Sequence, residues 1–345
     1  MKCRTIAVAF TATVAFLSLA IVASAQKDPY SLGTIRSGFT AGIAKFQPQS
    51  TYAPTFTFSN ASYGTGGVAL RNRSQGYIQI SGVTGPTQAA YLYWAVLLYE
   101  PTTIQLKEVA KVQLQREYPT GAGSATTVLN GTLLNVGGDP CWGSTGVWVY
   151  RAVVPTSLAT GNGSYKLVIP PAGAGLTDGE DPWDGNTVFP LWDGASLVIV
   201  GTGSANVGVI DGQAGTTFGG STLSNSYTLP ATVIVGVVLL DNIGYDGQIG
   251  NSRTIVNGPG YSSTNETTNV TGEPSTISVL VAGNPGGETG DSDWDGSSGW
   301  PLPQLWDDTG HDISDAFASG DTSFLVSYTT TWDCIGTVAA VISVQ

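Results

Sequence analysis

The chain of 345 residues is poor in the side chains that most catalytic and nucleic-acid-binding sites use. It has a single histidine, His311, and no lysine after Lys166. A Ser-His-Asp hydrolase would have to use His311, and no Gly-x-Ser-x-Gly sequence is present to supply a nucleophile. No Walker loop occurs either, and no glycine-rich dinucleotide fingerprint connects a strand to a helix. The pI of about 4.3 and the lack of a basic stripe argue against nucleic acid as a partner.

Good helix formers and charged residues are also scarce, the latter making up 11% of the chain. Short runs rich in Val, Thr, Ile and Tyr are instead bounded by Gly, Asn, Pro and Asp, which is typical of β-strands separated by turns. The content of 9 Trp, 14 Tyr and 10 Phe favours a packed core over disorder. The pattern predicts an all-β protein made of two tandem antiparallel β-sandwich domains, with no long helical segment after residue 26. The expected strands are 76–80, 89–99, 111–117, 147–154, 165–169, 196–200, 232–240, 278–282, 323–329 and 336–344.

The N-terminus has the pattern of a secretory signal peptide. A short basic segment, residues 1–4, precedes an apolar run over 6–22, and Ala23-Ser24-Ala25 forms a small-x-small cleavage site. A membrane anchor is the alternative, but the run is short and has no basic residues on its far side. We therefore expect residues 1–25 to be removed and the mature chain to be secreted, extracellular or at the cell surface. No later segment has the length of a membrane span, so we expect no membrane insertion after signal removal.

Two cysteines remain after such processing, Cys141 and Cys334, because Cys3 leaves with the signal peptide. An even pair in an oxidising compartment predicts a disulfide. Two buried thiols are the alternative.

An internal repeat suggests how the chain is divided. The segment 178–185 is followed by Pro190-Leu191-Trp192-Asp193, and residues 291–296 are followed by Pro303-Gln304-Leu305-Trp306-Asp307. Such a long period indicates duplicated domains, although chance similarity of two Trp-Asp loops is the alternative. We expect an N-terminal segment over 26–66, a first sandwich over 67–203, a Gly/Ser/Thr-rich linker over 204–226 and a second sandwich over 227–345.

Four short motifs carry a family resemblance: residues 90–94 (AYLYW), 129–131 (LNG), 161–165 (GNGSY) and 193–200 (DGASLVIV). In this order they resemble an uncharacterised β-sandwich family of secreted and cell-surface proteins in bacteria and archaea, with tandem jelly-roll-like halves. The resemblance covers residues 67–345 and implies a surface role without a known activity. The chain departs from the pattern at Ala152-Val153-Val154, where an Asp-Val-Thr-like turn is usual.

Negative charge gathers in the second half, where residues 167–345 contain 20 acidic residues and one basic residue, Arg253. Within it, Asp291, Asp293 and Asp295 alternate before Gly296, a spacing that allows carboxylates to surround one Ca²⁺. Further oxygens would come from neighbours such as Asp307 and Asp308. A second, less regular group comprises Asp178, Glu180 and Asp184. Hard oxygen ligands favour calcium over zinc, while solvated acidic turns are the alternative.

Several tryptophans lie in or beside these acidic loops. Trp183, Trp294 and Trp300 are candidates for stacking on sugar rings, whereas burial is the commoner fate of tryptophan. We expect burial for at least three of the five tryptophans formed by this group together with Trp192 and Trp306. His311, next to Asp312, is expected in a turn and not as a general base.

Together these observations predict a secreted cell-surface structural or adhesive protein with calcium-binding acidic loops. The partner would be a glycan or another surface protein. A carbohydrate-binding module is the first alternative and would show exposed, coplanar tryptophans around a groove. A glycosidase-like enzyme is the second, and would show two facing carboxylates in a cleft, one with a pKa raised by burial. A structural role would show a flat interaction surface or an assembling edge strand.

Overall fold

The computed structural model describes residues 50–70, 74–117, 126–139, 142–170, 189–213, 215–218, 221–234, 236–245, 266–282, 306–330 and 334–345. Strands predominate in these residues and pair almost entirely antiparallel, so the expected all-β sandwich class is confirmed. Within the same ranges there is one α-helix, α1 (Thr103–Val109), and no helix is long and apolar enough to cross a bilayer.

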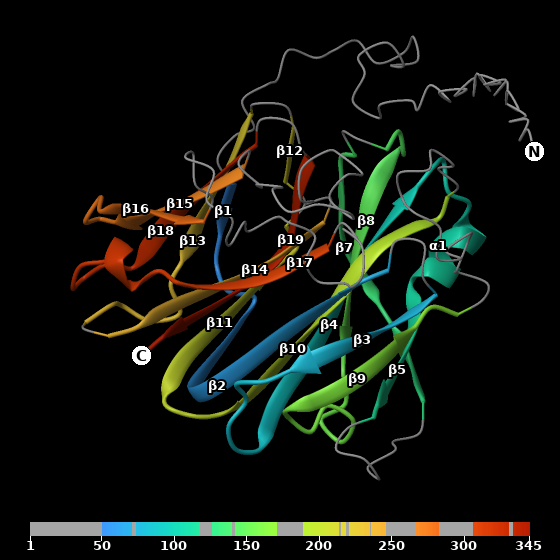
Figure 1. Ribbon diagram of the computed structural model, residues 1–345, viewed down its shortest axis with the longest axis horizontal. Coiled ribbons are helices and arrows are strands. Elements are labelled where there is room, and N and C mark those ends of the chain that lie inside the picture. Colours follow the sequence, from blue (N-terminus) through green and yellow to red (C-terminus); the bar gives the residue numbers. More distant parts are fainter. Residues whose placement is uncertain are drawn as a thin grey trace, which may run out of the picture.

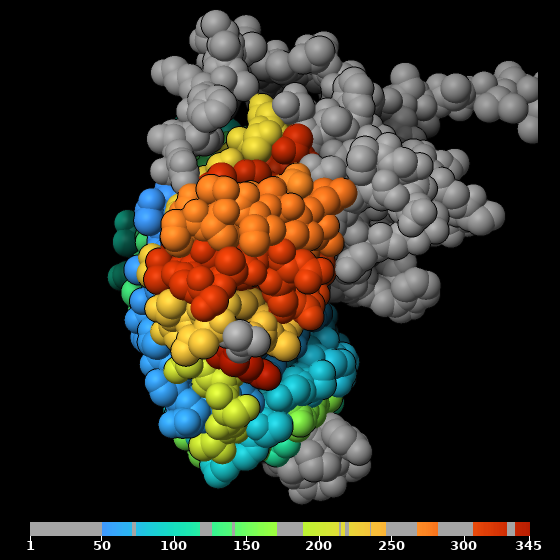
Figure 2. All heavy atoms as spheres, turned by 90° about the vertical axis from the view of Figure 1, so that its left-hand side faces the viewer, coloured from blue at the N-terminus to red at the C-terminus, as the bar shows by residue number. Residues whose placement is uncertain are grey.

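The strands form three sheets, with the largest between the two smaller ones (Figure 1). The four-stranded sheet has the order β3 (Gln75–Ile80), β9 (Gly163–Val168), β5 (Lys111–Arg116) and β6 (Thr127–Asn130). The five-stranded sheet has the order β1 (Ser50–Tyr52), β13 (Thr222–Thr228), β18 (Ser323–Thr330), β15 (Glu266–Glu273) and β16 (Ser278–Ala282). Seen from its own side, the five-stranded sheet covers that flank of the molecule, with β15, β16 and β18 in orange to red (Figure 2).

The ten-stranded sheet runs through both halves of the molecule. Its order is β17 (Trp306–Asp312), β14 (Val238–Tyr245), β19 (Cys334–Val344), β11 (Ala205–Asp211), β2 (Phe56–Ala69), β10 (Leu191–Thr202), β4 (Thr87–Leu98), β8 (Gly146–Val153) and β7 (Thr132–Gly137), with β12 (Thr216–Phe218) pairing to β19. The link between the halves is β2. Its C-terminal part pairs with β10, and its N-terminal part pairs with β11 after a register shift. One long strand is therefore shared by both sandwiches.

Three hydrophobic cores fill the spaces between the layers. The first sandwich packs the four-stranded sheet on β4, β8, β10 and the end of β2. The second packs the five-stranded sheet on β11, β14 and β19. A central core lies where the two halves of the large sheet face one another.

Strand β4 shows how the sequence encodes this arrangement. Its run Ala90–Leu98 is apolar throughout, because alternate side chains enter different cores and both faces are buried. Leu92, Trp94, Val96 and Leu98 belong to the core of the first sandwich, and Tyr91, Tyr93, Ala95 and Leu97 belong to the central core.

A polar link also joins the halves across the central core. Arg151 on β8 forms an ion pair with Asp211 at the end of β11. Thr55 and Tyr93 donate hydrogen bonds to the same carboxylate, at 2.5 and 3.4 Å. The guanidinium of Arg151 lies 4.8 Å from the centre of the Phe56 ring. Arg151 thus balances the charge of Asp211, and the Phe56 ring holds the guanidinium in place.

The division of the chain differs from the prediction. The segment 204–226, expected to be a linker, contains β11, β12 and most of β13, and β11 lies in the large sheet. Strand β1, from the expected N-terminal segment, pairs parallel with β13 of the second sandwich. The chain therefore enters the second sandwich before it builds the first. Residues 232–234, 236 and 237, which fall in the expected strand 232–240, precede β14 instead.

Candidate functional site

A groove of about 700 Å³ lies where the two sandwiches meet. It is bounded by β2, by the turn after β3, by the turn between β10 and β11, and by the adjacent ends of β14, β17 and β19. Small and polar side chains line it. The lining residues are Ala61, Ser62, Tyr63, Gly64, Thr65, Ser81, Gly82, Thr84, Gly203, Ser204, Ala205, Leu239, Asp241, Gly310, His311, Asp312, Ser343 and Gln345.

Asp241 is the carboxylate at the floor of the groove. It lies on β14, and two hydroxyls of β2 point at it: Tyr63 donates to Oδ2, and Thr65 donates to Oδ1 at 3.0 Å. Burial and the neighbouring charge of Asp241 raise the pKa of Tyr63 far above its ordinary value, so this tyrosine stays protonated and serves as a donor. The floor is therefore built by β14 of the second sandwich and by β2, the strand that both sandwiches share.

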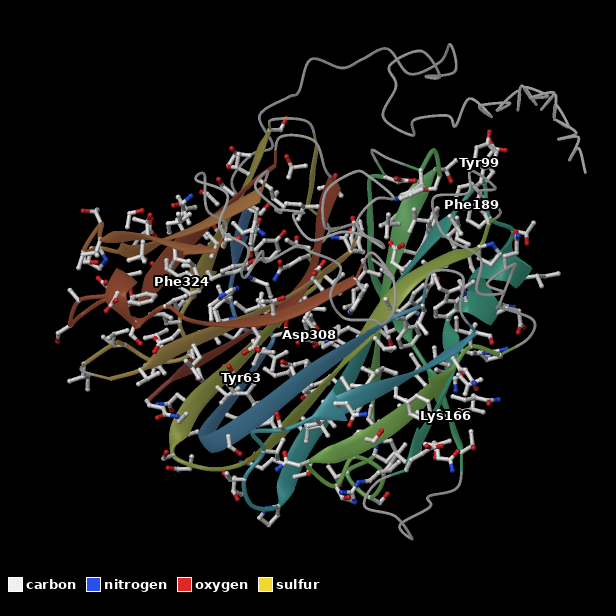
Figure 3. The ribbon with its side chains drawn as sticks, viewed as in Figure 1. Tyr63, Tyr99, Lys166, Phe189, Asp308 and Phe324 are labelled. Atoms are coloured by element: carbon white, nitrogen blue, oxygen red, sulfur yellow. The ribbon has the colours of Figure 1, made fainter. Side chains whose placement is uncertain are left out.

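Asp308 lies beside Asp241, on the neighbouring strand β17. The two residues occupy a diagonal cross-strand position, because Asp241 pairs with Gly310 and Asp308 pairs with Ile243. The residue is partly exposed as a whole, but its Oδ2 is shielded from solvent and has no hydrogen-bond partner. Burial raises the pKa of Asp308 to about 7; the Ser196 hydroxyl lowers it, and the charge of Asp241 raises it further. Tyr63 and Asp308 lie in the middle of the molecule, between the sandwiches (Figure 3).

Trp306 fixes β17 against the first half. Its ring packs on Gly194 so closely that a Cβ there would lie 2.3 Å from the Trp306 Cγ atom. Its indole Nε1 donates to the Ser196 hydroxyl at 3.0 Å. Since Trp306 and Asp308 are two residues apart on one strand, both side chains point toward β2 and β10. The tryptophan thereby sets the depth at which Asp308 lies.

Of the calcium ligands expected from the sequence, the described residues include Asp308, placed above, and Asp307. Asp307 is fully buried inside β17, opposite Gly244, and alternation along the strand places it on the face away from Asp308. The expected role of Asp307, to supply an oxygen to a calcium site in the loop 291–296, stays a prediction. Asp178, Glu180, Asp184, Asp291, Asp293 and Asp295 lie outside the described residues. Among the residues that are described, no group of three or more His, Cys, Asp or Glu side chains lies together.

Some of the other expected site residues lie within the described part of the chain, and others lie outside it. Trp192 and Trp306 are fully buried, in the first and the central core, whereas Trp183, Trp294 and Trp300 lie outside the described residues. Cys334 begins β19, and Cys141 and the side chain of Cys334 lie outside the described part. His311 is a nearly buried residue within β17, so its expected place in a turn is wrong.

The sequence does contain a signal for Asp241, although the motifs described above do not include it. This residue interrupts the apolar run Val237-Val238-Leu239-Leu240, and an acid inside a buried strand needs hydrogen-bonding partners. Tyr63 and Thr65, which supply them, show no such signal because their approach depends on how β2 crosses between the halves.

Comparisons with known proteins give only distant structural similarity. No protein-family model matches the chain. No curated protein sequence matches it. Among solved structures, a β-porphyranase of glycoside hydrolase family 86 from the human gut bacterium Bacteroides plebeius aligns with 11% identity and a TM-score of 0.26 over 79% of this chain, which spans 34% of the enzyme. The cryo-EM structure of the Sputnik virophage aligns with 7% identity and a TM-score of 0.21, covering 84% of this chain and 85% of the virophage chain. The similarity extends to β-rich architecture and assigns no family.

Proposed function

We propose that this chain is a secreted cell-surface protein with a structural or adhesive role, and that the groove is its ligand-contact surface. The observation that carries the proposal is the groove's construction. Its walls come from strands of the ten-stranded sheet that spans both sandwiches and from the turns after β3 and β10, so its polar groups are held in place before a ligand arrives. Its volume of about 700 Å³ is in the range of small-ligand sites.

The chemistry of the lining favours a polyhydroxylated ligand, a glycan. Exposed Ser81, Thr84 and Ser204 offer hydroxyls at the rim, and Asp241 and Asp312 offer carboxylate acceptors. These groups pair well with sugar hydroxyls. Because the carboxylates are negative, the groove disfavours acidic sugars and favours neutral or amino sugars. Recognition would rest on hydrogen bonds, since Tyr63 is the one Phe, Tyr or Trp among the described residues that line the groove.

Glycoside cleavage is less well supported, although Asp241 and Asp308 are two carboxyls of which one has a raised pKa. A general acid must come within hydrogen-bonding distance of the leaving-group oxygen. Asp308 is not among the residues that line the groove, and its Oδ2 is shielded from solvent. We therefore propose glycan binding, and not glycoside cleavage, as the function of the groove.

Secretion and surface location are supported by the sequence. The N-terminal basic segment, apolar run and Ala23-Ser24-Ala25 are those of a signal peptide, and the resemblance to a surface family of tandem jelly-roll-like halves points the same way. Secreted material is expected to begin at Gln26. An intact mass that retains residues 1–25 would contradict this part of the proposal.

A glycan array tests the ligand. The purified chain is expected to bind neutral or amino glycans, and Ser204→Trp is expected to abolish binding by filling the rim of the groove. Ser157→Trp, at an exposed serine that does not line the groove, is the matched control and should bind as the unaltered chain does. Equal binding by both variants, or no binding to any glycan, would overturn the assignment of the groove.

A further inference from the structure

Two carboxyls and several hydroxyls converge below the floor of the groove. Asp241 and Asp308 lie diagonally on β14 and β17, and both face β2. Thr65 on β2 donates to Asp241, and Ser196 on β10 accepts from Trp306. The hydroxyls of Thr65 and Ser196 are also the two that interact with the carboxyl of Asp308. Four strands thus direct oxygen atoms toward one place.

One oxygen in this group requires an explanation. The Oδ2 atom of Asp308 is shielded from solvent and has no hydrogen-bond partner, and an ionised oxygen in that position costs several kcal/mol. Asp308 is held in this position by the packing of Trp306 against Gly194 and by the bond from Trp306 to Ser196. A bound cation is a partner that would satisfy this oxygen.

A glycine keeps the approach from the groove open. Gly310 lines the groove directly opposite Asp241, and a Cβ at this position would lie 2.6 Å from Asp241 Oδ1. Any other residue would therefore crowd the carboxylate from the side on which a small ion enters.

We propose that Asp241 and Asp308 bind one Ca²⁺ below the floor of the groove, with the Thr65 and Ser196 hydroxyls as neighbouring oxygens and water from the groove completing the shell. The ligand set consists of hard oxygens, which favour calcium over zinc, and calcium accepts irregular shells of six to eight oxygens more readily than magnesium does. Two carboxylates balance the charge of one divalent ion. This site is distinct from the acidic loop at 291–296 and does not depend on a glycan in the groove.

Calcium titration in a defined background tests the site. The background carries Asp291→Asn, Asp293→Asn and Asp295→Asn, so that the acidic loop does not contribute. At pH 8 in this background, isothermal titration calorimetry is expected to show one calcium event with a Kd on the order of 10⁻⁴ to 10⁻³ M, as in extracellular sites. Asp308→Asn is expected to weaken it at least about tenfold, since one of the two charged ligands is lost. Asp315→Asn, at an exposed carboxylate that does not line the groove, is the matched control and should leave the calcium event unchanged.

A second measurement reports where the ion lies. Terbium bound at this site is expected to show emission sensitised by Trp306 and Tyr63, and calcium should quench it by displacement. Loss of this emission in Asp308→Asn, with an unchanged circular dichroism spectrum, would support the site. Equal calcium affinity and equal terbium emission in Asp308→Asn and in its background would overturn it, as would the absence of any calcium event at millimolar calcium. Glycan binding by the groove is measured separately, so either proposal can fail alone.

Discussion

Replacing Asp308 by asparagine is expected to stabilise the protein at alkaline pH and to have little effect in acid. The physical reason is the difference between the pKa of about 7 in the folded chain and the ordinary value of 3.8. Below pH 3.8 the carboxyl is protonated in both states and costs nothing. Between 3.8 and 7 the unfolded chain loses its proton while the folded chain keeps it, so stability falls as pH rises. Above 7 the folded protein holds a buried charge.

The size of the effect follows from the same two values. One pKa unit corresponds to about 1.4 kcal/mol, so the shift from 3.8 to about 7 corresponds to at most about 4 kcal/mol at pH 8 and above. Asparagine has nearly the shape of aspartate and carries no charge, and its amide group can donate to neighbouring oxygens. We therefore expect Asp308→Asn to exceed the unaltered chain in free energy of unfolding by about 2–4 kcal/mol at pH 8, and by less than about 1 kcal/mol at pH 4.

Urea unfolding followed by tryptophan fluorescence from pH 4 to pH 9, with EDTA present to remove calcium, measures this difference. Asp312→Asn is the control with the opposite sign. Hydrogen bonds from the side chain and backbone of Ser314 lower the pKa of Asp312, so its charged form stabilises the fold and its replacement should be harmful at neutral pH. A stability difference for Asp308→Asn that is constant from pH 4 to pH 9, or that is a loss at pH 8, would refute the reasoning.

Three further outcomes test the packing and the covalent link. Arg151→Met is expected to cost about 3 kcal/mol in urea unfolding, because it leaves Asp211 buried without its cation, and adding Asp211→Asn should recover much of that loss; no recovery would mean that the ion pair is not the cause. Gly194→Ala is expected to cost about 1–3 kcal/mol by pushing its Cβ against Trp306, and an unchanged thermal melt would contradict this contact. Thiol titration of the unfolded, non-reduced protein is expected to find Cys141 and Cys334 unreactive, and two free thiols would exclude the disulfide.

The all-β class could be predicted because it depends on local pattern. The apolar run of β4, the alternation in β9 and the turn residues between strands are all properties of neighbouring residues. Helix α1 was predictable too, and was missed. Thr102 and Gln105 form a capping box, in which Thr102 Oγ1 accepts from the Gln105 backbone and the Gln105 side chain accepts from the Thr102 backbone.

The path of the chain between the sandwiches could not be predicted in this way. Residues 204–226 are rich in Gly, Ser and Thr, a composition typical of linkers, yet Val207 and Val209 are fully buried in β11. What makes β11 a strand is its long-range pairing with β2 and β19, which local composition does not record. The groove also depends on long-range contacts. Tyr63 and Asp241 come from strands that meet only because β2 crosses between the halves.

The hydrogen bonds of the described carboxylates explain how the second half tolerates its excess of acidic residues. In isolation, 20 acidic residues against one basic residue imply repulsion that solvent or cations must relieve. Asp321 shows another solution: it accepts from the backbone and hydroxyl of Ser275 and from the Ala318 backbone, and these bonds lower its pKa although burial acts in the opposite direction.

Asp312 is held by Ser314 in the same manner, and Asp241 by Tyr63 and Thr65. In a chain with few lysines, backbone amides and hydroxyls take the place of cations as partners for carboxylates, and they connect turns and strands as they do so. Unlike Asp321, Asp312 and Asp241, Asp308 has one shielded oxygen that accepts no hydrogen bond. Because Asp308 also lies diagonally across from the carboxylate of Asp241, it is the place where we expect a cation.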